Sequence, residues 1–235
     1  MKIYNNLNIQ KKHQNNVVAI GNFDGLHLGH QKVIKEARQK AKKNNLPFGI
    51  ITFEPIPVMF FNKTIKNHRI NSLDQKKNQL NKFNLDFLII LKFNKSFSKL
   101  QANKFIEKVI YKKVKCKFLY VSNNFRFGFK RQGNIETLKK FAKLYNYKTI
   151  ITEPLKKNYT TISSTAIRKK ISQGKINLVN KLLNRNWCIQ GKVIKGQMRG
   201  RKIGFPTCNL KIHNYITPKL GDYAVSVKTR KIIRT

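Results

Sequence analysis

The sequence predicts an α/β fold in which a doubly wound parallel sheet is followed by an incomplete antiparallel β-barrel. Two observations support this prediction. Short apolar runs alternate with helical patterns over the first 184 residues, which is typical of a parallel sheet with helices on both faces. After residue 184 the chain has more glycine and short strand-like pieces, as antiparallel barrels do. We therefore expect two units, residues 1–184 and residues 185–235.

The first unit is expected to hold buried strands and helices in alternation. The strands are apolar runs such as VVAIG and FGIITF, and they are expected at 17–21, 48–53, 86–91, 117–121 and 148–152. The helices are expected at 28–43, 101–113, 134–145, 164–173 and 176–183. Sheets of this kind bind ligands at the carboxyl ends of their strands, near the point where the strand order reverses. The segments that follow the strands are therefore candidates for a site.

The composition fits a folded protein of a reducing compartment. The chain has 235 residues, of which 40% are hydrophobic and 11% aromatic, so it can bury a sizeable core and is not a disordered chain. No apolar run approaches the length of a membrane span, and the first residues lack the apolar region of a secretory signal. Cys116, Cys188 and Cys208 form no C-x-x-C pair, so the sequence supports neither a disulfide framework nor a thiolate zinc site. We expect a cytoplasmic protein without a membrane partner.

The charge balance has two interpretations. Fifty basic and nine acidic side chains give a formal net charge of +41, which favours a binder of nucleic acid. Forty of the basic residues are lysines spread along the whole chain, whereas a surface that reads phosphates or bases favours arginine. Lysine, asparagine and isoleucine share A/T-rich codons, so a biased genome would produce this mix without selection for a partner, and we favour this second interpretation. On both interpretations we expect non-specific binding of nucleic acid.

The segment AIGNFDGLHLGH (19–30) carries the strongest chemical signal. It follows the first strand and leads into a helix, whose first N–H groups and partial positive charge suit a phosphate. His27 and His30 are three residues apart and so share a helix face, and Gly29 between them leaves room for a nucleotide. Two imidazoles there could stabilise charge on a leaving pyrophosphate. The alternatives are a metal site or an exposed pair. We expect the remaining histidines, His13, His68 and His213, to be solvated.

A second candidate segment, TISSTAIR (161–168), lies far downstream. Its hydroxyls can cap the helix that follows or donate hydrogen bonds to phosphate oxygens. Arg168 lies one helical turn later, where it could pair with the same phosphates. The alternative is a plain capping run.

These two segments resemble the signatures of the nucleotidylyltransferase superfamily, whose sheet is Rossmann-like. The chain more closely resembles the bacterial bifunctional riboflavin kinase/FMN adenylyltransferases, or FAD synthetases. Ile56 and Ser122 depart from that family's pattern, in which His and Gly are usual, and Asn124 fills an Asp/Asn position. The segments that carry the resemblance are GNFDGLHLGHQ (21–31), ITFEPIPVMFF (51–61), RINSLDQK (69–76), FNKSFSKLQANKFIEKVI (93–110), VSNNFRFGFKRQGN (121–134) and GKVIKGQMRGRKIGFPTCNL (191–210).

The resemblance implies transfer of AMP from ATP to FMN with Mg²⁺, which gives FAD and pyrophosphate. It gives catalytic roles to His27, His30 and Arg168, which would steady the phosphates and the leaving pyrophosphate. The turn after the first strand would form one side of the nucleotide pocket, and the hydroxyl run would form the other. The residues with this implied binding role are Gly21, Phe23, Asp24, Gly25, Gly29, Asn124, Ser163, Ser164 and Thr165.

For the second unit the resemblance implies phosphorylation of riboflavin to FMN, with Thr207 and Asn209 binding Mg²⁺ and phosphates. No acidic residue follows Asp222, so the general base of such a kinase has no counterpart, and we expect a truncated barrel without kinase activity. Two other functions stay open at this point. One is another nucleotidylyltransferase of the same fold, and the other is a decayed, non-catalytic basic protein that binds nucleic acid.

Overall fold

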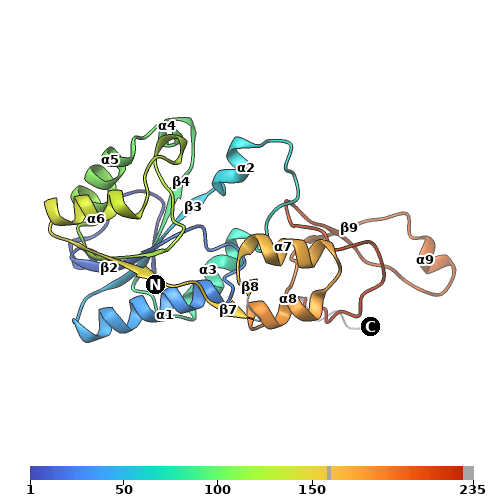
Figure 1. Ribbon diagram of the computed structural model, residues 1–235. Helices are drawn as coiled ribbons and strands as arrows, with labels where there is room; N and C mark the ends of the chain where they lie inside the picture. The colour runs from blue at the N-terminus through green and yellow to red at the C-terminus, as the bar shows by residue number, and fades with distance from the viewer. Residues whose placement is uncertain (158–159, 230–235) are drawn as a thin grey trace.

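A six-stranded parallel sheet organises the first unit of the computed structural model, which describes residues 1–157 and 160–229 (Figure 1). The strands are β1 (Lys2–Tyr4), β2 (Asn16–Ile20), β3 (Phe48–Glu54), β4 (Phe87–Lys92), β5 (Cys116–Ser122) and β6 (Lys148–Thr152). They lie in the order β1-β4-β3-β2-β5-β6, and every neighbouring pair is parallel. The expected parallel sheet is confirmed, with β1 as an additional edge strand. The strand order reverses between β2 and β5.

Helices cover both faces of this sheet. The longer helices of the first unit are α1 (Leu28–Lys43), α3 (Leu73–Asn81), α6 (Ile135–Leu144), α7 (Ser164–Ser172) and α8 (Ile176–Leu183). A short helix α5 (Ala102–Phe105) continues into a π-helix, η2 (Ile106–Val114), so the expected helix at 101–113 is there in altered form. The short elements are η1 (Lys11–His13), α2 (Pro57–Phe61), α4 (Lys95–Ser98), η3 (Phe129–Arg131) and the antiparallel pair β7 (Lys156–Lys157) and β8 (Thr160–Thr161).

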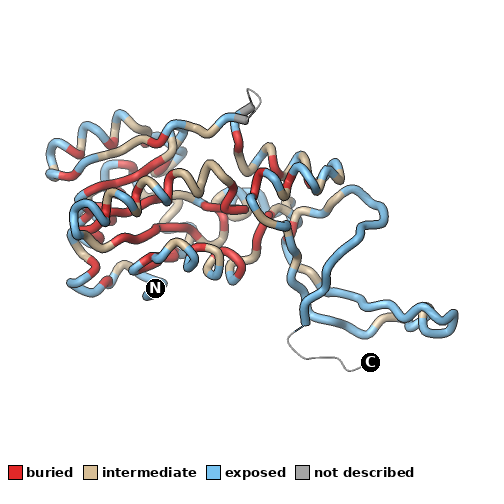
Figure 2. Tube along the Cα trace, turned by 90° about the horizontal axis from the view of Figure 1, so that it is seen from below, coloured by how far each residue is buried: buried red, intermediate tan, exposed pale blue. Residues whose placement is uncertain are grey.

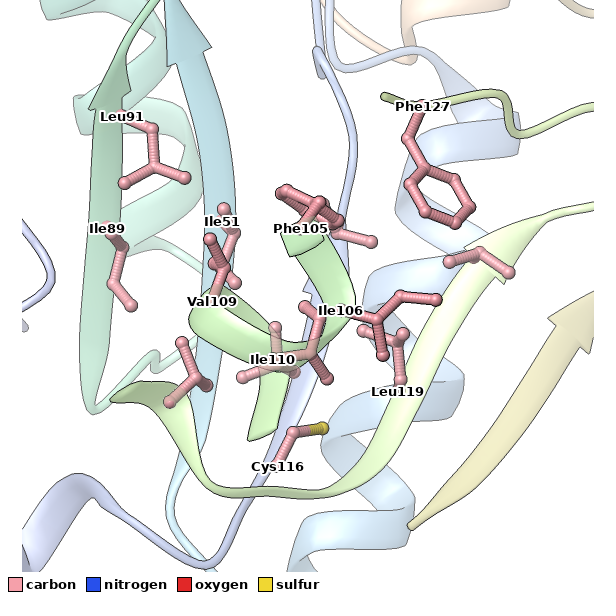
Figure 3. Close-up of a cluster of buried hydrophobic side chains, with 14 of the residues drawn as sticks. Ile51, Ile89, Leu91, Phe105, Ile106, Val109, Ile110, Cys116, Leu119 and Phe127 are labelled. Atoms are coloured by element: carbon pink, nitrogen blue, oxygen red, sulfur yellow. The ribbon is translucent and has the colours of Figure 1, made fainter. Parts of the chain in front are cut away.

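The central strands β2 to β5 are largely apolar on both faces because both faces are covered. Along β2, Val17 and Ala19 face α1, whereas Val18 and Ile20 face the opposite cluster. Figure 3 shows that second cluster, in which η2 crosses the sheet and its apolar side chains meet those of β3, β4 and β5. A third cluster joins α7 and α8 to Ile70 and Ile162, beyond the carboxyl end of the sheet. It fixes the helix that carries the second candidate segment.

The second unit is far more open than the first (Figure 2). Its regular elements among the described residues are β9 (Lys192–Ile194), α9 (Arg199–Lys202) and β10 (Asn209–Lys211), and β9 pairs with β10 antiparallel. Every residue of β9 and β10 is exposed. The part of residues 185–235 that the structure describes is thus one antiparallel pair without a closed barrel, and the barrel expectation is not confirmed. The end of the stretch after Tyr223, residues 230–235, lies outside the described residues.

One segment of the second unit, residues 213–216, returns to the first unit. The backbone N–H groups of His68 and Arg69 donate to the Asn214 carbonyl at 2.9 and 2.7 Å, and the N–H of Ile216 donates to the Arg69 carbonyl at 2.8 Å. Tyr215 between them is 3% exposed. We call residues 213–216 the return segment. It lies alongside the chain at 68–71, which follows β3 and α2.

Two findings bear on earlier expectations about polarity. Among the described residues, no helix combines the length and the apolar character needed to cross a membrane. The expectation that His13 is solvated is wrong, because its ring is buried and stacks on Phe87 with 5.0 Å between ring centroids. Its Nδ1 shares a hydrogen bond of 2.8 Å with the Tyr4 hydroxyl, which makes His13 a packed structural residue. The same expectation is wrong for His68, which is half-buried and lines a cavity, whereas His213 is exposed.

Candidate active site

A cavity of about 760 Å³ opens at the carboxyl ends of the strands, where the strand order reverses. Both candidate segments line it, although more than a hundred residues of sequence separate them. Gly25 is not among its lining residues, and Thr207 and Asn209 lie away from it on the second unit. The sequence-predicted residues that line the cavity are Gly21, Phe23, Asp24, His27, Gly29, His30, Asn124, Ser163, Ser164, Thr165 and Arg168.

His27 and His30 are held together by the start of α1. His27 is the N-cap residue, with extended backbone, and its Nδ1 accepts a hydrogen bond of 3.3 Å from the backbone N–H of His30. The two rings stack with 3.7 Å between centroids and 19° between planes. The histidines are thus adjacent as expected, but one caps the helix and the other lies within it. Because Nδ1 of His27 accepts, the proton of the neutral ring is on Nε2.

Both imidazoles are uncharged near neutral pH. Burial, with the nearby charges of Arg168 and Arg185, lowers the pKa of His27 to about 4. Burial, with His27, Lys76 and Arg168 close by, lowers the pKa of His30 well below its usual value. Nδ1 of His30 is buried and has no hydrogen-bond partner among the described residues. The site therefore offers neutral donors and acceptors in a cationic surrounding, which suits an anionic ligand.

Asp24 and Arg168 form an ion pair that links the two candidate segments. Their Oδ2 and Nη2 atoms are 2.6 Å apart, and the side chains are 2% and 15% exposed. Arg168 Nε also donates to the His68 carbonyl at 2.8 Å. Asp24 in turn accepts from the backbone N–H groups of Ile70 and Asn71. The sequence offered no sign of this pairing, and it ties Arg168 to the protein as well as to the cavity.

The hydroxyl run caps the helix that follows it and also lines the cavity. Ser163 is the N-cap of α7, and its Oγ accepts from the N–H of Ala166 at 3.2 Å. Ser164 Oγ donates to the Asp24 carbonyl at 2.8 Å, so it fastens the two segments to each other. Thr165 is exposed and lines the cavity, as Ser163 and Ser164 also do. Capping is therefore present, and Thr165 leaves a hydroxyl open to a ligand.

Two glycines permit the close packing of this turn. Gly25 has φ of +80°, and a Cβ there would lie 3.0 Å from Ile70 side-chain atoms. A Cβ on Gly29 would lie 3.2 Å from the His27 ring and 3.3 Å from the Ile162 carbonyl oxygen. Gly29 thus serves close approach of α1 to the second segment, in addition to lining the cavity. Gly25 does not line the cavity, but its positive φ lets the backbone make the turn that carries the lining residues.

The far wall of the cavity is aromatic, and our sequence reasoning did not include it. Phenylalanines from the end of β3, from the segments after β4 and β5 and from helices α4 and α5 meet there, with centroid distances of 5.4 to 6.2 Å between neighbouring rings. Their signal in the sequence was an aromatic residue just after an apolar run, as at Phe93. The side chains of this wall are Phe53, Phe93, Phe97, Phe105, Phe125 and Phe127.

The two departures from the family pattern also lie at this wall. Ile56 lines the cavity and is 2% exposed. Ser122 Oγ donates to Asn124 Oδ1 at 2.9 Å, so the serine orients the amide whose Nδ2 stays available as a donor. Basic side chains lie on the same side of the cavity, at Arg126, Lys130 and Arg131. An aromatic face beside cationic groups suits a flat ring that carries a phosphate.

The described residues do not form a metal site of their own. No group of three His, Cys, Asp or Glu side chains is arranged to hold a metal ion within residues 1–157 and 160–229. The acidic residues that line the cavity are Asp24, which is paired with Arg168, and Glu153. Thr207 and Asn209 are both exposed. Donor chemistry of this kind fits a metal that arrives bound to phosphates, not one resident in a protein cage.

This architecture is that of a nucleotidyltransferase of the α/β class. Its parallel sheet carries an H-x-G-H turn at the point where the strand order reverses, and the hydroxyl-rich start of α7 faces that turn. A model of the FAD synthetase family matches residues 9–166, and one of riboflavin kinase matches residues 183–234. The chain belongs to the bifunctional riboflavin kinase/FMN adenylyltransferase family.

Curated relatives cover most of the chain. The bifunctional enzyme of Buchnera aphidicola from Schizaphis graminum is 42% identical over 94% of this chain and 71% of its own length. That of Escherichia coli K12 is 34% identical over 90% of this chain and 67% of its own length. A crystal structure described as a macrolide-efflux protein from Streptococcus pneumoniae matches with a TM-score of 0.78 at 29% identity, covering 92% of this chain and 71% of that one.

Proposed function

We propose that this protein acts in flavin cofactor biosynthesis, by transferring AMP from ATP to FMN to form FAD and pyrophosphate. One observation carries the proposal: a single cavity brings the histidine pair, the hydroxyl-rich start of α7 and an aromatic wall together. The histidine pair and the start of α7 suit a nucleoside triphosphate, and the aromatic wall suits the ring system of a flavin. Residues 1–184 hold all three, so we assign the reaction to this unit.

In this reaction a phosphate oxygen of FMN attacks the α-phosphorus of ATP. The bond from the α-phosphorus to the oxygen that bridges to the β-phosphate breaks, and pyrophosphate leaves with the electron pair. The protein's share is positioning and charge stabilisation. Nε2–H of His27 donates to a phosphate oxygen, and the neutral His30 ring lies against it at stacking distance. Thr165 and the N-terminus of α7 meet the phosphate chain from the opposite wall.

The flavin ring is assigned to the aromatic wall. Its edge reaches Asn124, whose amide group is oriented by Ser122 and has Nδ2 free to donate. Arg126, Lys130 and Arg131 line the same side and supply positive charge for the FMN phosphate. On this assignment the attacking phosphate lies between the ring and the histidine pair, which is what an in-line attack on the α-phosphorus requires.

Mg²⁺ enters this proposal as part of the Mg·ATP substrate, since the residues present do not hold it alone. When bound, it neutralises charge on the triphosphate. For the second unit we propose a relation to riboflavin phosphorylation through Thr207 and Asn209, with its boundary to the first unit near residue 184, just after α8. We also propose a cytoplasmic location, where FMN and ATP are present together.

The test is direct conversion by the purified 235-residue protein. FMN and ATP labelled on the α-phosphate, with Mg²⁺, should give labelled FAD, and label on the γ-phosphate should appear in pyrophosphate. Chromatography and the loss of flavin fluorescence would follow the product. A His213→Ala variant is a matched control, because that histidine is exposed and away from the cavity. A folded protein that binds ATP yet forms no FAD would contradict the proposal.

A further inference from the structure

Lys76 is an unusually buried lysine that the proposed reaction does not yet use. It lies in α3, is 1% exposed and does not line the cavity. Its Nζ donates to the Asn22 carbonyl at 2.8 Å and lies 3.4 Å from Thr52 Oγ1. Among the described residues, no acidic side chain lies within ion-pair distance of it. Fully buried lysines are normally paired with an acid, so this one requires an explanation.

The nearest carboxylates are committed to other cations. Asp24 pairs with Arg168, and Glu54 forms a short ion pair with Arg69. Burial lowers the pKa of Lys76, the two carboxylates raise it, and Arg69 lowers it. Three basic and two acidic side chains thus gather in and behind the cavity wall, which leaves a surplus of one positive charge when Lys76 is protonated. That charge is part of what lowers the pKa of His30.

The loop of residues 21–26, which Lys76 contacts through the Asn22 carbonyl, has backbone dihedral angles that are unfavourable for bulky residues. Phe23, Gly25 and Leu26 have φ of +47°, +80° and +43°, a region that bulky residues rarely adopt. Such a conformation persists where the surrounding structure holds it. Here the Asn22 carbonyl is held from below by Lys76 and by Thr52 Oγ1, which donates to it at 3.1 Å. Because C=O and N–H of a trans peptide point in opposite directions, the Phe23 N–H points away from Lys76.

We propose that Lys76 is a positioning residue for the nucleotide site. It holds the Asn22 carbonyl inward, and so keeps the loop of residues 21–26 in the shape that receives phosphates. Its charge adds to the positive potential behind the histidine pair. The inference rests on the proposed function for its ligand, a nucleoside triphosphate, and on the contacts above for its mechanism.

The test compares Lys76→Met with Lys77→Met in the 235-residue protein. Lys77 is the neighbour on α3 and forms a surface pair with Asp74, so it controls for loss of a charge. Calorimetry with Mg²⁺ and α,β-methylene-ATP should show binding about tenfold weaker in Lys76→Met, the scale of one lost hydrogen bond to a charged group. Amide resonances of Phe23 and Gly25 should move in that variant and stay in place in the control.

A folded Lys76→Met protein that binds the analogue as the control does, with these amides unmoved, would overturn the inference. If Lys76→Met does not fold, Thr52→Val removes the other donor to the same carbonyl without changing charge. It should move the same amides and weaken analogue binding by a smaller factor, and unmoved amides would overturn the inference. Neither readout depends on turnover. A wild-type protein that binds the analogue but makes no FAD contradicts the proposed function alone.

Discussion

Asp24 and Arg168 are 144 residues apart in the sequence, yet their charged groups meet at 2.6 Å in the wall of the cavity. The pair joins the loop after β2 to helix α7, and these two elements carry the two candidate segments. Asp24 also accepts from backbone N–H groups of the chain at 70–71, and Arg168 donates to the His68 carbonyl. This ion pair, together with the hydrogen bond from Ser164 to the Asp24 carbonyl, therefore holds together the walls that we assign to the phosphates.

Asp24→Asn should destabilise the protein by about 3–5 kcal/mol, because it leaves a largely buried Arg168 without its counter-charge. Urea denaturation would measure this, and FAD formation should fall with it. The control is Asp74→Asn, whose exposed pair with Lys77 is worth under about 1 kcal/mol. The double variant Asp24→Asn/Arg168→Met should lose less stability than the sum of the losses in the two single variants. A simple sum would show that the pair is not coupled.

His30→Ala should raise the activation free energy of FAD formation by about 2–4 kcal/mol, the scale for the loss of one hydrogen-bond donor that stabilises the transition state. The ring stacks on His27 and lines the cavity, so it is placed to meet the leaving pyrophosphate. Steady-state kinetics with saturating FMN and Mg·ATP would measure the change in kcat. Turnover equal to that of wild type would remove His30 from the mechanism.

Stability should fall as the pH is lowered from about 6.5 towards 4. The pKa of His27 is about 4 in the folded protein and near 6.5 when unfolded, so the unfolded chain takes up more protons in this window. His27 alone contributes on the order of 3 kcal/mol to the loss. His30, His13 and His68 act in the same direction, since their pKa values are also lowered by burial.

Urea midpoints measured across this pH window would show the effect. A His27→Asn/His30→Asn variant should lose less stability on acidification than wild type, because it retains only the shares of His13 and His68. Equal slopes in the two proteins would mean that the histidine pair is not buried as neutral imidazoles. An ATP analogue should also oppose the acid loss, since its negative charge raises both pKa values.

The 235-residue chain should not convert riboflavin to FMN. Phosphoryl transfer needs an acceptor hydroxyl held in line and a group that takes its proton. Thr207 and Asn209 are exposed in the described second unit, and after Glu153 the sequence has a single acidic residue, the exposed Asp222. Incubation with riboflavin and Mg·ATP, analysed by chromatography, measures this. FMN produced at enzymic rates would show that a competent base lies elsewhere.

Binding to RNA and DNA should be measurable and non-specific. The charge of +41 is spread over the whole chain, so the attraction is to phosphates and carries no sequence information. Affinity should drop steeply between about 50 and 200 mM salt. Tight binding of one sequence at the higher salt, in the presence of scrambled competitor, would instead indicate a specific nucleic-acid function.

Strands β2 to β6 and the longer helices were predictable, because buried β-branched runs and helical apolar spacing are local signals. Helix α3 was missed, although Ser72 and Gln75 form a capping box at its start. Strand β1 is too short for a periodic signal, and the π-helical form of η2 depends on packing. The barrel was expected from the glycine content, from short strand-like pieces and from a resemblance, and the described residues show a single antiparallel pair in its place.

The site was predictable in its motif residues and not in its connections. The two segments could be placed at strand ends and helix starts, and they do line one cavity, but their chemical roles stay predictions. The Asp24–Arg168 pair could not be foreseen, because spacing in sequence does not say which distant charges meet. The same holds for Lys76, which reads as one more surface lysine in a chain that has forty.

The return segment has a consequence for which residues of this protein can be substituted during evolution. Its backbone closes the hydrogen bonds of the chain at 68–69, next to the residues that hold Asp24, and Trp187 Nε1 donates to the Ile70 carbonyl at 2.9 Å. Tyr215 donates to Gln75 Oε1 at 2.9 Å from the same side. Selection for FAD formation would therefore preserve Trp187 and Tyr215, even though both lie in the part of the chain that the riboflavin kinase model matches.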